Sequence, residues 1–392
     1  MLIKKKITSY FFVSFSVLIL NLRPGIIGEL NGIVLFSLLL FLMALYITTH
    51  NHLKINIMNN TYILYILMII FVMYALIQAI LIAKNIRPAF NSSLTLLISI
   101  HIFLLLIQDF HFINIFNKTL VVIIILLSIS SLVTYIMYYL KLEIKLTDIQ
   151  THQRGFVENY ASLYFPFTIM GANEYYFSSL YFMERSFGIF REPGIYQVYI
   201  QYAYFLVDLK KVSFKRYHNI IKIMIILSLI TTFSFSGIII FIFLITIKAC
   251  SERANSKILN ILIISLFTLA VSGYLLTLFN TRIASESFFY RFDSLKNIVS
   301  TLSINPLFGL GYLQKINTVS TVNFLGSIVT IGIIGSTIYL LIWIISIALA
   351  KEKKYLLLPF FITLFFAQPI YSDPIIFLIL LLNSKEPKLE NN

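Results

Sequence analysis

Two arginines and a carboxylate stand close together in the stretch 184–194. Arg185 and Arg191 are six residues apart, Glu192 follows directly, and a Pro-Gly pair at Pro193 precedes an apolar run. An arginine guanidinium pairs bidentately with phosphate oxygens, so this stretch could hold a lipid diphosphate at a membrane surface. Ordinary attraction of the two arginines to lipid headgroups explains the same spacing.

A second stretch with similar chemistry contains Arg291 and then the run NPLFGLGY at residues 305–312. Its proline and two glycines, Pro306, Gly309 and Gly311, predict a tight backbone structure whose amides could face an anion. Two glycines at this spacing are common in proteins, so the pattern alone carries little specificity.

These residues must be positioned by a membrane protein. The chain of 392 residues is 59% hydrophobic and 12% charged, about half the charged share of an average soluble domain. This composition excludes a water-soluble globule. The net charge of +14 includes no basic run longer than the three lysines at residues 4–6, which disfavours nucleic-acid binding. The single cysteine excludes an internal disulfide or a thiolate metal cluster, and no spacing typical of metal ligands is present.

The apolar runs predict an all-α, polytopic protein with about twelve transmembrane helices in a single membrane domain, residues 1–392. The predicted helix centres lie near Val17, Leu38, Met68, Leu97, Ile129, Ala203, Ile225, Phe241, Leu266, Ile338, Ile362 and Phe377. Short connections on one side hold far more lysine and arginine than those on the other side. By the positive-inside rule, both termini are expected in the cytoplasm.

Two long segments, residues 141–194 and 277–321, are then expected on the extracytoplasmic side, where long connections usually carry function. The first is rich in tyrosine, phenylalanine and carboxylates, which suits sugar rings with apolar faces and hydroxyl edges. An interfacial or re-entrant helix is the alternative for this segment. Residues 232–237 separate two short apolar runs and predict a turn, with a broken helix lining a cavity as the alternative.

The order of these features resembles bacterial Wzy-type polysaccharide polymerases of the O-antigen polymerase and ligase superfamily. The resemblance rests on GIFREPG entering a helix, on Arg291, on NPLFGLGY and on TVNFLGSIVTIGIIG, within about residues 180–340. It implies a glycosyltransferase of the bacterial cytoplasmic (inner) membrane that joins repeat units carried on undecaprenyl diphosphate. The resemblance implies no nucleotide sugar, no metal and no other cofactor.

The resemblance also assigns residues. Arg185 and Arg291 match the family's loop arginines, and Asn323 matches an asparagine at the start of the next span. The surrounding motif is matched by Gly188, Glu192, Pro193, Pro306, Gly309 and Gly311. We expect Arg185, Arg191 and Arg291 to stabilise the lipid diphosphate. Glu192 is expected to accept the hydroxyl proton or, alternatively, to orient an arginine.

Two positions depart from the family pattern. Val322 stands where a histidine often precedes Asn323, so no imidazole base is assigned, and residues 234–237 lack the arginine of a Ser-Arg-Gly pattern. These departures favour a divergent polymerase over a ligase that transfers finished glycan to an acceptor. A lipid-linked sugar transporter or flippase is a further alternative. The implied partners are undecaprenyl-diphosphate-linked oligosaccharides and the lipid bilayer, with a chain-length regulator and a flippase as further candidates.

Overall fold

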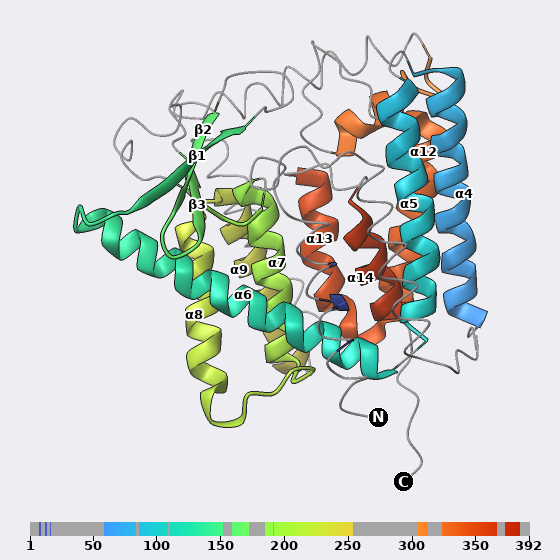
Figure 1. Cartoon of the computed structure of the whole chain (residues 1–392). Coiled ribbons are helices and arrows are strands. Elements are labelled where there is room, and N and C mark those ends of the chain that lie inside the picture. The colour runs from blue at the N-terminus through green and yellow to red at the C-terminus, as the bar shows by residue number, and fades with distance from the viewer. Residues whose placement is uncertain are drawn as a thin grey trace, which may run out of the picture.

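The computed structural model describes residues 59–83, 86–108, 110–151, 159–171, 185–190, 192–253, 305–312, 324–366 and 373–384, with residues 8, 12, 13 and 16. Figure 1 shows how these elements are arranged. The helices are α4 (Asn59–Leu81), α5 (Ile86–Leu106), α6 (Phe110–Tyr139), α7 (Pro193–Asp208), α8 (His218–Thr231), α9 (Phe235–Arg253), α12 (Phe324–Ala350), α13 (Lys354–Phe366) and α14 (Pro374–Ser384). The short 3-10 helices are η1 (Lys215–Tyr217) and η2 (Lys351–Lys353), and the strands are β1 (Lys145–Thr151), β2 (Asn159–Tyr164), β3 (Thr168–Gly171) and β4 (Arg185–Gly188).

Within the described part of the chain, α4, α5, α6 and α12 are long and apolar enough to cross a membrane. Shorter apolar helices, α8, α9, α13 and α14, belong to the same helical body. The chain is therefore a multi-pass membrane protein. Nine of the predicted span centres fall on described helices, whereas Val17, Leu38 and Leu266 lie outside the described residues.

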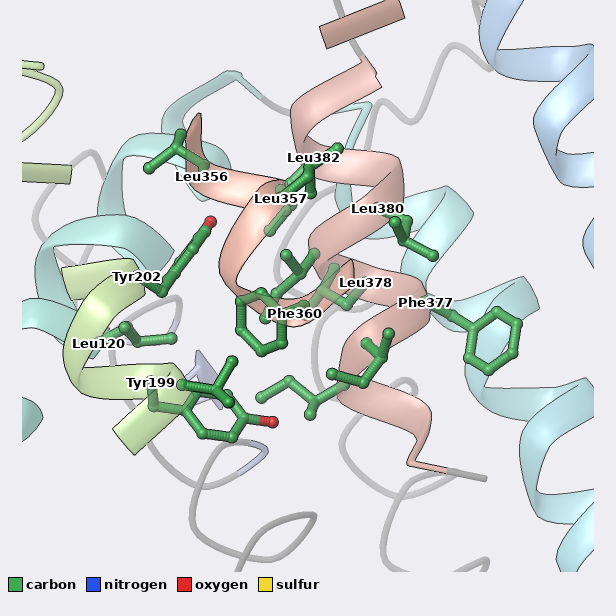
Figure 2. Close-up of a cluster of buried hydrophobic side chains, with 14 of the residues drawn as sticks. Leu120, Tyr199, Tyr202, Leu356, Leu357, Phe360, Phe377, Leu378, Leu380 and Leu382 are labelled. Carbon is green, nitrogen blue, oxygen red and sulfur yellow. The ribbon is translucent and has the colours of Figure 1, made fainter. Parts of the chain in front are cut away.

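One densely packed part of the core lies where α7, α13 and α14 meet (Figure 2). Every residue of α7 from Pro193 to Val207 is buried, as expected for a helix that has apolar side chains on most of its circumference. Tyr199 and Tyr202 contact the ring of Phe360 on α13 edge-on, with centroid distances of 5.4 and 5.6 Å. This packing fixes α7 inside the helical body.

Two buried glutamines connect α7 to its neighbours. Gln201 donates to the Gly237 carbonyl of α9 at 2.9 Å and to the Gln197 side chain at 2.5 Å. A Cβ at Gly237 would lie 2.2 Å from the Gln197 Oε1, so glycine leaves room for the Gln197 side chain in this position. The Gln201 amide nitrogen thereby finds acceptors on both α7 and α9 inside an apolar body.

Asp208 at the end of α7 forms an ion-pair cluster with two lysines. Its two carboxylate oxygens accept from Lys222 of α8 and Lys248 of α9, each at 2.5 Å. Gln197, Gln201, Tyr204 and Asp208 follow helical spacing, so one polar face runs along α7 toward α8 and α9.

The segment after α6 forms a four-stranded antiparallel sheet in the order β1-β2-β3-β4. The prediction of an all-α chain is therefore wrong here, and residues 145–151, 159–171 and 185–188 do not form the alternative interfacial helix. The strands are only four to seven residues long, so their period-two signal is weak beside the strongly apolar helices. Across β1 and β2, hydrogen bonds from Lys145 and Ser162 hold the pKa of Asp148 below its ordinary value.

The sheet is attached to the second half of α6 through hydroxyl groups. The Ser130 and Thr168 hydroxyls lie 2.6 Å apart, and those of Ser131 and Ser186 lie 2.9 Å apart. Figure 1 shows the sheet beside the later part of α6 and the start of α7. Strand β4 is thus held where the sheet meets the helices.

We predict that Asp208→Asn lowers the free energy of unfolding by on the order of 1–3 kcal/mol, because it removes the carboxylate shared by two lysines that are 24% and 14% exposed. Thermal unfolding of the purified protein in detergent measures the change. The matched control is Asp148→Asn, since Asp148 and its partner Lys145 are largely exposed and water screens their pair. Equal effects of the two substitutions would contradict the importance of the Asp208 cluster.

Candidate functional site

Arg185 begins β4 at the junction between the sheet and the helices. Its Nε donates to the Thr232 carbonyl at 3.1 Å. Thr232 lies in the turn between α8 and α9, which covers residues 232–234. The predicted turn at residues 232–237 is therefore confirmed in its first half, whereas residues 235–237 begin α9. The fold therefore joins two segments that are more than 40 residues apart in sequence.

The connection from β4 to α7 is a tight aromatic turn. Gly188 has φ +56, and a Cβ there would lie 3.0 Å from the Tyr196 ring. The Phe190 ring stacks on those of Tyr196 and Tyr199, with centroid distances of 5.4 and 4.8 Å. Glycine and aromatic packing together set the direction in which the chain enters α7.

Glu192 caps the start of α7 with its backbone. Its extended conformation directs its carbonyl to accept from the amides of Ile195 and Tyr196, both at 3.1 Å, while its side chain makes no capping hydrogen bond. Pro193 follows in the first turn, where its missing amide costs nothing. The half-buried Arg185 and the N-terminal end of α7 both favour an anionic ligand.

The second predicted stretch, residues 305–312, lies against α12 at the point where this helix is broken, and its backbone bonds to the helix there. Gly332 interrupts the helix with φ 69 and ψ 177. The amides of Leu310 and Gly311 donate to helix carbonyls just before the break, and two helix amides just after it donate to carbonyls of the stretch, over 2.9–3.2 Å. Hydrogen bonds lost from the helix are thus replaced by bonds to this stretch.

Two side chains of α4 complete the bonding at the break. The fully buried Gln78 donates to the carbonyls of Phe308 and Ile331, and the Tyr74 hydroxyl donates to the same Ile331 carbonyl at 2.8 Å. Sequence reasoning missed both residues. The Gln78 amide could have been found from the sequence, because it lies inside an apolar span, where polar groups usually have a specific partner.

The glycines at the break allow two backbones to touch. A Cβ at Gly309 would lie 2.5 Å from the Gly332 nitrogen, and a Cβ at Gly332 would lie 2.3 Å from the Leu307 carbonyl oxygen. The amides of Gly309, Leu310 and Gly311 all donate to backbone carbonyls. The amides expected to face an anion therefore bond within the protein instead.

The predicted site residues fall into two groups among the described residues. One group lies at the junction of β4 and α7: Arg185, Gly188, Glu192 and Pro193. The other lies at the contact of α4 and α12: Pro306, Gly309 and Gly311. Figure 1 shows α7 apart from α4 and α12 in the helical body. Three further predicted residues lie outside the described residues: Arg191, Arg291 and Asn323.

Comparisons with models of protein families, with curated proteins and with solved structures find no match to this chain. A functional proposal therefore depends on the chain's own residues, on their geometry and on the order of motifs in its sequence.

We predict that Gly309→Ala and Gly332→Ala each lower the free energy of unfolding, by on the order of 1–3 kcal/mol from the positive φ angle alone and by more through the backbone clash. Thermal unfolding in detergent measures the loss. Ile333→Ala is the matched control, because Ile333 lies beside the break with an exposed side chain. The explanation fails if the glycine variants are as stable as the control.

Proposed function

We propose that the chain is a glycosyltransferase that joins undecaprenyl-diphosphate-linked oligosaccharide repeat units into O-antigen, capsular or exopolysaccharide chains. The observation that carries the proposal is the half-buried Arg185, held by the Thr232 carbonyl on the strand that leads into α7. An arginine and a helix N-terminus both attract phosphate oxygens, and here they occur together. The order of motifs in the sequence supports the same reaction.

The proposed reaction breaks the bond between the sugar and its lipid diphosphate and forms a bond to an acceptor hydroxyl. Negative charge grows on the leaving diphosphate, and Arg185, with Arg191 and Arg291, neutralises it. Cations already held in place lower the barrier because no reorganisation is needed during the reaction. Glu192 either accepts the proton of the acceptor hydroxyl or orients one of the arginines.

The proposal includes a location on the outer face of the bacterial cytoplasmic membrane. It places about twelve spans in one membrane domain, both termini in the cytoplasm, and residues 141–194 and 277–321 outside. The long apolar helices support a multi-pass arrangement, and the distribution of lysine and arginine supports its orientation.

We predict that Arg185→Ala slows polymerisation on the order of 10²-fold, the usual cost of losing one transition-state contact. The assay supplies purified protein in lipid vesicles with lipid-linked repeat units and measures chain length on gels. Arg185→Lys keeps the charge but not the bidentate fork and should give an intermediate rate. Arg216→Ala is the matched control, since this exposed arginine lies on η1 in the connection between α7 and α8.

Other outcomes would redirect the assignment. Unchanged polymerisation by folded Arg185→Ala and Arg291→Ala proteins contradicts the proposed mechanism. A deletion strain that accumulates polymer of normal length on its lipid carrier identifies a ligase, whereas single repeat units are expected for a polymerase. Translocation of lipid-linked sugar in sealed vesicles without chain growth identifies a transporter.

A further inference from the structure

The turn between β2 and β3, residues 165–167, is bonded to the side of α6. The Thr134 hydroxyl donates to the Phe165 carbonyl at 3.1 Å, and the Phe167 amide donates to the Ser130 hydroxyl at 2.9 Å. The Phe165 amide donates to the Ile144 carbonyl at 2.9 Å. The backbone of the turn is thereby satisfied by partners within the protein.

These bonds fix the position of the turn along the axis of α6. Ser130 and Thr134 lie five to nine residues before Tyr139, the last residue of α6, which is about 7–14 Å along the axis. The helix has 30 residues, whereas about 20 cross the hydrocarbon core. The helix is thus longer than the hydrocarbon core requires, and the turn is bonded to its second half, near the end that leads into the sheet.

An exposed apolar stripe on α6 continues to the level of the turn. The residues of the stripe are spaced as one helical face. They are Val122, Leu126, Ile129 and Ile136 of α6, and Leu140, which directly follows the helix. Ser130, which binds the Phe167 amide, directly follows Ile129 of this stripe in sequence. The turn is therefore bonded to the same stretch of α6 that carries the stripe.

The side chains at the turn are apolar and exposed. Phe165 is 48% exposed and Phe167 is 43% exposed, and the neighbouring Leu142 and Ile144 are 61% and 52% exposed. Lys141 lies in the turn that ends α6 and has a positive φ angle of 56°. Exposed apolar side chains with tyrosines and lysines close by in sequence are typical of a membrane interface.

We propose that Leu142, Ile144, Phe165 and Phe167 form a lipid-binding surface that lies in the bilayer at the boundary between headgroups and acyl chains. This surface, the hairpin surface, extends the lipid-facing stripe of α6. Non-helical backbone at this depth requires internal hydrogen bonds, which Ser130, Thr134 and Ile144 provide. The inference does not depend on the proposed function.

Spin labels on single cysteines test the hairpin surface. The chain has one cysteine, Cys250, which forms no disulfide, so Cys250→Ser gives a cysteine-free background. In that background, Phe167→Cys and Leu142→Cys are labelled with a nitroxide in vesicles of phosphatidylethanolamine and phosphatidylglycerol. Power saturation then measures collisions with oxygen, which concentrates in lipid, and with a water-soluble nickel chelate.

Two reference positions set the scale: Leu126→Cys on the exposed apolar face of α6, and Lys211→Cys in the exposed connection after α7. We expect the ratio of oxygen to nickel collisions at positions 142 and 167 to lie several-fold above that at position 211. Nickel collisions as frequent as at position 211 would overturn the proposal, because they place the surface in water. Protection from both reagents would also overturn it, because it indicates coverage by protein. If Phe167→Cys does not fold, the label at position 142 decides between these outcomes.

Discussion

Backbone amides and carbonyls in hydrocarbon have no water to bond, so each departure from a helix must be matched by a partner inside the protein. The described residues meet this constraint in different ways. At the α12 break, a second backbone segment and the Gln78 amide replace the lost helical bonds. At the β2–β3 turn, the Ser130 hydroxyl accepts from the Phe167 amide and the Thr134 hydroxyl donates to the Phe165 carbonyl. The positions of both non-helical segments follow from where these partners stand on α4 and α6.

The packing of helix α7 fixes the position of the junction between β4 and α7, which contains Arg185. It is buried along nearly all its length, and its aromatic face is fixed by α13. Its polar face is bonded at one end to Gly237 of α9 and at the other end to the lysines that share Asp208. Because α9 follows the turn that contains Thr232, the same packing that holds α7 also positions the carbonyl that binds Arg185. A rigid support of this kind lets a single guanidinium hold a fixed direction.

The sequence predicted well what depends on hydrophobic runs and poorly what depends on distant partners. Runs of apolar residues located α4, α5, α6 and α12, and Thr232 and Ser234 marked the turn between α8 and α9. The break at Gly332 was missed, because α12 has no proline and its glycines and hydroxyl residues are common inside apolar spans. The cause of the break is a contact with residues 305–312. Similarly, the bond between Arg185 and Thr232 was not predictable, since the two residues come from separate elements and share no local pattern.

The α12 break also has a consequence for how the molecule is assembled during synthesis. A straight α12 satisfies its own backbone, so the break becomes favourable only when residues 305–312 and Gln78 lie alongside it. Gln78 precedes Ile331 by 253 residues, so α4 is made long before its partner emerges from the ribosome. A chain released before α12 leaves the Gln78 amide without the carbonyls that it binds in the complete fold.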